Sequence, residues 1–420
     1  MKILLISYDN DSFIHFFPLG LAYVASALRN DGNEVEIYSQ DLYHYPESHL
    51  KEYIKRDHYD VVGVGMCAGY YQYQKLLKIS KAIPEGIEYW VGGHLVSPDP
   101  DYFKRITGAD WVCVGEYDYK EDVDSLPYPA WELFPIDYYA LMRLPHAENS
   151  DRCFPVLSGR GCPFQCSFCY RMHEGYRPRL VKSIVEEIQI LMKDYRINYI
   201  DFADELLMVS PNRTVEIANA VKPLGIKWMC NGRLNCAKPK VLKAMRESGC
   251  VFINYGIESM DDEVLKLMNK KLTTKQIVAG IEATLAEGIS PGFNFIWGNI
   301  GDTMETLWKS VDFLLKYDDH SQLRTIRPVT PYPGCDLYYY AIEKGLLKDC
   351  ADFYENKHIN SDLLSVNFTE LTDEGFHRLL FEANSELVRD YYEYQSYKLN
   401  SMARKLYLDK DTSFRGFRQI

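Results

Sequence analysis

The 420-residue sequence lacks features that would indicate several classes of function. No stretch approaches the ~20 apolar residues that a bilayer-spanning helix needs, so no membrane span is expected. The apolar run at residues 2–7 is too short for a signal peptide, and the predicted location is the cytoplasm. An excess of basic residues is also missing, because 47 Lys and Arg stand against 59 Asp and Glu, for a net charge of −12. A nucleic-acid partner bound mainly through its phosphates is therefore not expected.

Cysteine is present, but not in the pattern of a secreted disulfide framework, because the count of 11 is odd. Eight cysteines are scattered along the chain, and most of them are expected to be small buried residues. No internal repeat and no low-complexity tract is found. The three remaining cysteines are clustered, and they are Cys162, Cys166 and Cys169.

The first 115 residues alternate between strand and helix patterns. The predicted strands are residues 2–7, 34–38, 61–66, 88–92 and 110–114, and the predicted helices are residues 18–28 and 70–82. Such repeated units imply a parallel sheet that is covered on both faces and binds ligands at the carboxyl ends of its strands. Glycines gather at those ends, although turns of a purely structural domain would have them too. No GxGxxG dinucleotide fingerprint follows the first strand.

The later chain repeats the alternation with longer helices. Residues 117–150 combine proline with aromatic residues and predict an extended strap that packs on a surface. The strands predicted after the strap are residues 153–158, 198–203, 226–231, 251–257, 291–297 and 323–328. The chain is therefore predicted to be an α/β protein, with a doubly wound parallel sheet, a partial (β/α)6 barrel and a helical C-terminal cap. The corresponding boundaries are 1–116, 117–150 for the strap, 151–338 and 339–420.

The cysteine cluster has the spacing CxxxCxxC and directly follows the first barrel strand. Three thiolates on one short loop can hold three irons of a [4Fe–4S] cluster and leave the fourth iron open to another molecule. A zinc site with His173 as fourth ligand is an alternative, but the gap between the first two cysteines fits it poorly. A redox pair of Cys166 and Cys169 would lack its usual thioredoxin-like context.

With an aromatic residue before its third cysteine, this motif resembles that of the radical S-adenosylmethionine (SAM) superfamily. The resemblance implies that the open iron holds the amino and carboxylate groups of SAM, and that an electron from the cluster cleaves SAM to a 5′-deoxyadenosyl radical. Carboxylates suit the SAM ammonium, although Asp204 could equally cap a helix. Glu305 resembles a residue beside the adenine. The SAM contacts implied by the resemblance are Phe168, Asp204, Glu205, Arg233, Glu258, Ile296 and Pro331.

The order of doubly wound domain, Pro-rich strap and barrel resembles the cobalamin-binding subgroup of that superfamily, over essentially the whole chain. The resemblance implies that cobalamin lies between the N-terminal sheet edge and the barrel mouth. The DxHxxG motif of many cobalamin proteins is absent, since His15 follows the first strand at the wrong spacing. The span between Glu116 and the strap is also short. The implied cobalamin contacts are Gly65, Met66, Cys67, Gly92, Gly93, His94, Gly115 and Glu116.

The function implied by the resemblance is a cobalamin-dependent methyltransferase. It would use SAM twice and transfer a methyl group to an unactivated carbon, or to phosphorus, of a small-molecule or peptide substrate. An external flavodoxin- or ferredoxin-like protein would supply electrons, and the catalytic residues stay unassigned. Rearrangement, ring contraction or cyclisation on the same architecture is one alternative, and a non-catalytic cobalamin or iron–sulfur sensor is another. A methylthiotransferase would need three further N-terminal cysteines, whereas only Cys67 and Cys113 precede residue 150.

Overall fold

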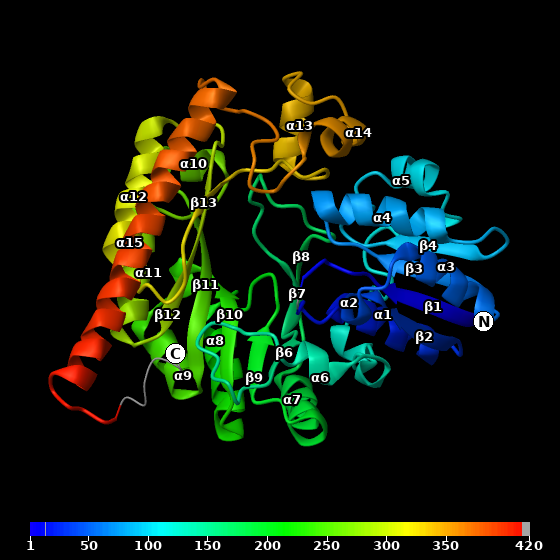
Figure 1. Cartoon of the computed structure of the whole chain (residues 1–420), viewed down its shortest axis with the longest axis horizontal. Coiled ribbons are helices and arrows are strands. Elements are labelled where there is room, and N and C mark those ends of the chain that lie inside the picture. The colour runs from blue at the N-terminus through cyan, green and yellow to red at the C-terminus, as the bar shows by residue number, and fades with distance from the viewer. Residues whose placement is uncertain (13, 414–420) are drawn as a thin grey trace.

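Two parallel sheets, one from each half of the chain, dominate the structure (Figure 1). The structure is a computed structural model, and it describes residues 1–12 and 14–413. The last seven positions of the predicted C-terminal region, residues 414–420, lie outside the described residues. The predicted fold class is confirmed in both halves of the chain.

The N-terminal sheet has the strand order β2-β1-β3-β4-β5, and all of its pairs are parallel. Neighbouring residues of β1 bury opposite faces, since Leu4 and Ile6 contact one apolar cluster and Ile3 and Leu5 another. Helices therefore cover both faces, as expected for a parallel sheet. In this order a ligand crevice forms where the chain direction switches between β1 and β3. The strands are β1 (Lys2–Ser7), β2 (Glu34–Ser39), β3 (Val61–Gly65), β4 (Glu88–Gly92) and β5 (Trp111–Val112), and the helices are α1 (Leu19–Asn30), α2 (Gln40–Tyr43), α3 (Glu47–Arg56), α4 (Tyr70–Ala82) and α5 (Pro100–Thr107).

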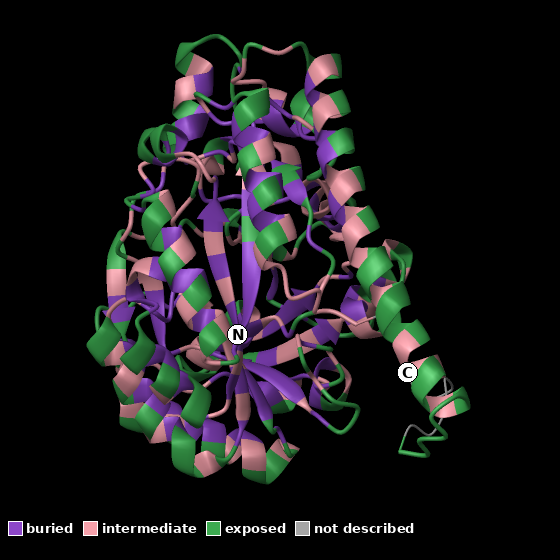
Figure 2. Ribbon diagram, turned by 90° about the vertical axis from the view of Figure 1, so that its left-hand side faces the viewer, coloured by how far each residue is buried: buried purple, intermediate pink, exposed green. Residues whose placement is uncertain are grey.

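The second sheet has the order β13-β12-β11-β10-β9-β6, which is an open barrel of six parallel strands. The outward-facing residues of its strands, such as Phe202 and Trp228, are fully buried under the surrounding helices (Figure 2). The strands are β6 (Cys153–Val156), β9 (Tyr199–Phe202), β10 (Lys227–Gly232), β11 (Cys250–Glu258), β12 (Ser290–Trp297) and β13 (Ile326–Pro328), and the helices are α7 (Val181–Tyr195), α8 (Pro211–Val221), α9 (Pro239–Glu247), α10 (Asp262–Leu267), α11 (Thr274–Ala286) and α12 (Met304–Tyr317). All six predicted strands of this half are found.

The segment between the two halves is ordered and packed. It has two 3-10 turns, Val123–Ser125 and Trp131–Leu133, and the short helix α6 (Ile136–Tyr139). Trp131 belongs to the same apolar cluster as residues of α1 and of the barrel. Further along, Leu144 packs with Tyr199 and closes the amino-terminal end of the barrel. The segment therefore links the two halves through the core and not as a flexible tether.

The C-terminal region contacts both halves (Figure 1). It begins with α13 (Asp336–Glu343), α14 (Cys350–Asp352) and a π-helical turn (Phe353–Lys357), and it ends with the long helix α15 (Asp373–Tyr407). Tyr354 stacks on Tyr73 of α4 with ring centroids 5.0 Å apart, and Phe376 of α15 stacks on Trp297 at 4.3 Å. None of the helices in the described part of the chain is long and apolar enough to cross a membrane.

Candidate active site

The three clustered cysteines lie at the end of the first strand and in the connecting loop of a small antiparallel hairpin, β7 (Gly159–Cys162) and β8 (Gly175–Pro178). Gly161 has a φ of +84°, and a Cβ at this position would overlap the carbonyl oxygen of Gly175. Only glycine therefore lets the two hairpin strands approach so closely. In the connecting loop, Cys166 is buried and Cys169 is exposed.

The donor set suits an iron–sulfur cluster with one open corner. Burial raises the pKa of the half-buried Cys162, and the nearby Cys166 thiol raises it further. Thiolates at these positions therefore need a strong cationic centre, which irons provide. Among the described residues, no three His, Cys, Asp or Glu side chains converge on one metal ion. A cluster does not require this, because each of its cysteines binds a different iron. His173 is engaged elsewhere, since its Nε2 accepts a hydrogen bond of 3.3 Å from the Glu116 amide.

Segments far away in the sequence hold the cysteine loop in place. The Ser167 amide donates a hydrogen bond of 2.9 Å to the carbonyl oxygen of Met268, just after α10. The Asn269 side chain donates to the carbonyl oxygen of Gln165. The Leu337 amide, at the start of α13, donates to the carbonyl oxygen of Ser167 at 2.9 Å. These three hydrogen bonds fix the geometry of the loop before any cofactor binds.

Asp204, predicted to contact SAM, is instead fully buried beneath the hairpin. Its carboxylate accepts hydrogen bonds from the Ser158 amide at 2.8 Å, the Ser158 hydroxyl at 2.9 Å and the Gly159 amide at 2.7 Å. Burial raises the pKa of Asp204 to about 7, although these hydrogen bonds oppose the shift. The Asp204 carboxylate therefore positions the start of the hairpin in this structure, and its predicted contact with SAM stays a prediction.

Glu205 is the acidic residue that remains available. It is exposed, and its Oε2 accepts a hydrogen bond of 2.9 Å from the Gly161 amide. Its carboxylate therefore lies at the hairpin, one residue from the first cysteine.

Arg233 lies against the cysteine loop from the side of β10. Its guanidinium stacks on the Phe164 ring at 3.7 Å and donates to the carbonyl oxygen of Lys270. Its Nε is buried without a hydrogen-bond partner. Burial lowers the pKa of Arg233, and the Cys166 thiol opposes this shift. A buried donor without a partner is costly, so this nitrogen suits an anionic group of a ligand.

Lys270, which the sequence analysis did not single out, contacts both Glu258 and Phe168. The Lys270 Nζ lies 2.8 Å from Glu258 Oε1 in a buried ion pair, and 5.6 Å from the centre of the Phe168 ring. Glu258 has a φ of +72°, which aims its side chain back toward the loop after α10. Of the other predicted SAM contacts, Ile296 is half-buried near the end of β12, and Pro331 is buried after β13.

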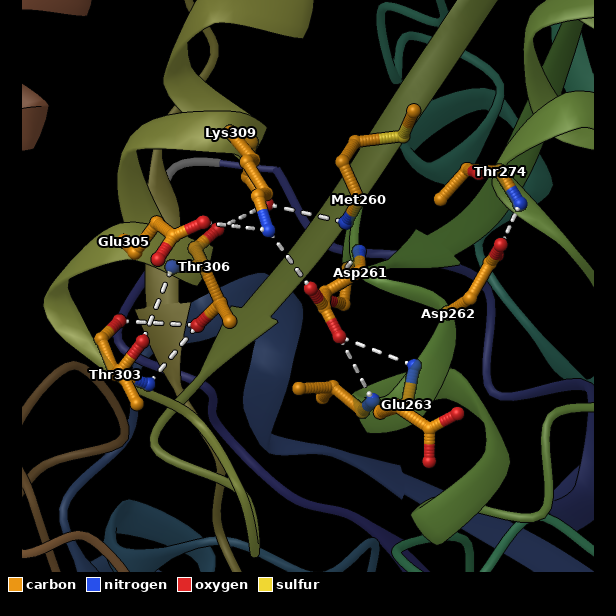
Figure 3. Close-up of polar contacts among 12 residues, drawn as sticks. Met260, Asp261, Asp262, Glu263, Thr274, Thr303, Glu305, Thr306 and Lys309 are labelled. Atoms are coloured by element: carbon orange, nitrogen blue, oxygen red, sulfur yellow. Dashed lines mark hydrogen bonds and ion pairs between the residues drawn. The ribbon is translucent and has the colours of Figure 1, made fainter.

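Glu305 takes part in a group of exposed ion pairs on α12 (Figure 3). Lys309 lies 2.9 Å from the Glu305 carboxylate and 3.0 Å from that of Asp261. Asp261 in turn accepts hydrogen bonds of 3.0 and 3.2 Å from the Glu263 and Val264 amides and caps α10. The group thus supports the helix whose C-terminal end holds the cysteine loop.

A cavity of about 480 Å³ lies between the carboxyl ends of the N-terminal strands and the barrel. All eight residues predicted to contact cobalamin line it, as do Arg160, Gly161 and Glu205 from the barrel side. Gly93 has a φ of +95°, and a Cβ there would overlap the carbonyl oxygen of Met66. Burial lowers the pKa of His94, so a neutral imidazole faces this cavity. Since Glu205 borders both the cavity and the cysteine hairpin, the two predicted cofactor sites share a wall.

Glu116 belongs to a charge network that ties the N-terminal half to the hairpin. Arg160 lies 2.7 Å from one Glu116 oxygen and forms two hydrogen bonds, of 3.0 and 2.8 Å, with the Asp118 carboxylate. Arg177 of β8 pairs with the other Glu116 oxygen. Burial lowers the pKa of Arg160, but Asp118 and Glu116 outweigh it and raise the pKa overall. The network holds the two walls of the cavity together.

One carboxylate inside the barrel has no partner among the described side chains. Asp201 lies on the inner face of β9, because its neighbours Ile200 and Phe202 face the outer helices. Burial alone raises the pKa of Asp201 to about 6. A carboxylate whose pKa is higher in the folded than in the unfolded state weakens folding once it ionises.

We therefore expect Asp201→Asn to stabilise the protein by an amount that depends on pH. The penalty of Asp201 is absent well below its unfolded pKa, grows as pH rises to about 6 and is constant above pH 7. A shift of this size corresponds to at most about 3 kcal/mol. Urea unfolding across this pH range measures the difference, and Asp312→Asn, an exposed carboxylate on α12, is the matched control. Equal stability of Asp201→Asn and wild type at neutral pH would contradict the assigned burial.

Comparisons with known proteins agree with this geometry. Residues 156–314 match the family model of the radical SAM superfamily, and residues 11–122 match that of the B12 binding domain. An uncharacterized methyltransferase of Pyrococcus horikoshii is 29% identical, over 83% of this chain and 84% of that protein. The bacteriochlorophyllide d C-12(1)-methyltransferase of Chlorobaculum tepidum is 26% identical, but over only 59% of this chain and 57% of its own length.

Among solved structures, the radical SAM methyltransferase TsrM from Kitasatospora setae, with cobalamin and a [4Fe–4S] cluster bound, has a similar fold. Its TM-score is 0.65, with 15% identity over 82% of this chain and 78% of that chain. At this identity the likeness concerns the fold alone, which is the same succession of an N-terminal sheet and an open barrel.

Proposed function

Since this chain belongs to the radical SAM enzymes that carry an N-terminal cobalamin-binding domain, we propose that it is a cobalamin-dependent methyltransferase that cleaves SAM reductively. Its cofactors are a [4Fe–4S] cluster, SAM and cobalamin. The observation that carries the proposal is the shared wall, because Glu205 borders the cavity and is hydrogen-bonded to the hairpin that presents the cysteines. Methyl transfer needs the two cofactor sites to be neighbours, whereas separate sensing functions do not.

Different residues of the chain would hold the cluster and SAM. When bound, the cluster supplies the electron that cleaves SAM, and cobalamin supplies the methyl group. Cys162, Cys166 and Cys169 hold three irons. Glu205 suits the SAM ammonium, and the unpartnered Nε of Arg233 suits its carboxylate.

The cavity between the two halves suits cobalamin. Its glycine-rich strand ends let the backbone approach a large planar cofactor closely, as Gly93 illustrates. The exposed Cys169 gives a flavodoxin- or ferredoxin-like donor access to the cluster. The walls of the barrel exclude water from the reacting groups. The protein thus supplies position and shielding, and the cofactors supply the difficult chemistry.

The names of the two relatives described above favour methyl transfer over the other reactions of this architecture. The proteins of Pyrococcus horikoshii and Chlorobaculum tepidum are both called methyltransferases. A rearrangement or cyclisation would consume SAM only as a radical source. A sensor would have no need of acidic and basic side chains around the open corner of a cluster.

The test is the fate of SAM in anoxically reconstituted protein with cobalamin and a strong reductant. We expect both 5′-deoxyadenosine and S-adenosylhomocysteine, each well above a control without reductant, measured by liquid chromatography and mass spectrometry. Formation of 5′-deoxyadenosine alone would favour rearrangement or cyclisation. Formation of neither product by protein with a full cluster would refute the proposal.

A further inference from the structure

The interior of the barrel carries a layer of polar side chains that the cofactor sites do not use. Asn294 of β12 donates a hydrogen bond of 2.9 Å to Asn254 of β11. Asn254 donates one of 3.1 Å to Asn231 of β10, and Asn231 donates one of 2.8 Å to the Asp204 carbonyl oxygen. We call these three asparagines the amide ladder. Each side-chain nitrogen of the ladder donates in the direction from β12 toward β9. The side-chain oxygen of Asn294, Oδ1, therefore accepts no hydrogen bond from the described residues.

One glycine makes room for the amide ladder, and a second makes room for the neighbouring ion pair. Gly292 pairs with Asn254 across the strands, and a Cβ at Gly292 would lie 2.6 Å from the Asn254 side-chain oxygen. Gly256 pairs with Asn294, and a Cβ there would overlap the Glu258 carboxylate. The ladder is therefore a built feature of the strand pairing, and it lies next to the ion pair that contacts the cysteine loop.

Solvent reaches this inner face, although the outer face of the same strands is sealed. Asn294 is exposed, and Asn231 and Asn254 are half-buried. In contrast, Ile253 and Tyr255 of β11, which point outward, are fully buried. Polar groups that face inward and stay accessible are suited to a ligand that enters from the cofactor side.

Asp201 is the charged residue on the inner face of the barrel next to the amide ladder. It lies on the neighbouring strand, paired in register with Met229, which is two residues before Asn231. No cation among the described residues pairs with it, and Lys270, at the edge of the layer, is already paired with Glu258. An unpaired carboxylate inside a barrel is stabilised when a cationic ligand binds beside it.

We propose that Asp201 and the amide ladder form the substrate site of the barrel and that the substrate carries a protonated amine. The ammonium group pairs with Asp201, and a further N–H or O–H donor of the substrate bonds the free Asn294 oxygen. The inference rests on the proposed function and deepens it by naming the chemical class of the substrate. An anionic substrate is excluded from this layer by the charge of Asp201.

The test is equilibrium dialysis of the full chain, with cluster and SAM bound, against three matched probes under anoxic conditions above neutral pH. The probes are phenethylamine, 2-phenylethanol and 3-phenylpropionate, which share one ring and differ in charge. We expect phenethylamine to bind roughly tenfold more tightly than the other two probes, as charge-assisted hydrogen bonds allow. Asp201→Asn abolishes this preference, whereas Asp312→Asn leaves it unchanged, and so does Asn294→Leu, because phenethylamine has no second donor for the Asn294 side chain.

The outcomes separate this inference from the proposed function. Equal binding of the three probes, no retention of the amine, or an intact preference in Asp201→Asn overturns the amine site, even if SAM is cleaved. A preference that depends on Asp201 supports the site, even in a protein that cleaves no SAM. Cluster absorption and circular dichroism of each variant establish that it is folded, and Asn294→Leu, at an exposed position, provides a second folded variant.

Discussion

The Cys166→Ala variant is expected to lose its iron–sulfur absorption near ~400 nm and to form no 5′-deoxyadenosine above background. Cys166 is the buried member of the three cysteines, and the hydrogen bonds of Ser167 and Gln165 fix its loop. Two thiols cannot hold three irons, so the cluster loses one of its three protein ligands. Iron and sulfide analysis after anoxic reconstitution, together with nucleoside detection, measures both losses.

A matched control is Cys153→Ala. Cys153 is also buried, but it packs with Leu144 and Tyr199 at the closed end of the barrel. This variant is expected to keep its cluster and its SAM cleavage, apart from a modest loss of stability from the smaller side chain. Full cluster content in Cys166→Ala would contradict the assignment of the site, and loss of the cluster in both variants would show only general destabilisation.

The Arg160→Met variant is expected to lose about 3–5 kcal/mol of stability, because it leaves the buried Asp118 carboxylate without a cation and Glu116 with Arg177 alone. The side chain of Asp118 is only 5% exposed and that of Glu116 only 17% exposed. Cobalamin occupancy is expected to fall as well, since Arg160 and Glu116 line the same cavity. Denaturant unfolding and the cobalamin content of reconstituted protein measure the two effects.

Three further variants sharpen this test. Arg160→Lys keeps the charge but not the two-pronged contact with Asp118, so its loss is expected to be smaller. Adding Asp118→Asn to Arg160→Met removes the carboxylate that has lost its cation. The double variant is therefore expected to recover part of the lost free energy of unfolding. Arg389→Met breaks an exposed ion pair on α15 and is expected to have almost no effect. An Arg160→Met protein as stable as Arg389→Met would rule out the network as a clamp.

The elements predicted correctly from the sequence are those that depend on neighbouring residues. The buried run of β3 is continuous, and β11 alternates between buried and half-buried residues. The cysteine spacing is likewise a local pattern. The hairpin β7–β8 was not predicted, since neither of its strands shows an apolar alternation. The hairpin forms because of close backbone contact at Gly161 and the paired arginines on its strands.

The roles that were missed or changed all depend on distant partners. Asp204 bonds a serine 46 residues earlier, and Arg160 pairs with an aspartate 42 residues away. Arg233 reaches the carbonyl oxygen of Lys270 across 37 residues. Such partners are decided by how elements far apart in the sequence pack together, which no local pattern records. The residues predicted to contact cobalamin do line one cavity, because the carboxyl ends of the strands of one parallel sheet meet at one edge.

The clamp formed by Arg160, Arg177, Glu116 and Asp118 has a consequence for how such proteins can be cut and recombined. A barrel fragment made without its first 118 residues would present two stranded guanidinium groups beside its first cysteine. The hairpin that carries the first cysteine would then lose the ion pairs that hold it against the N-terminal half. Hybrids between relatives should therefore exchange all four charged positions as one cassette, with the crossover placed later in the chain than the hairpin.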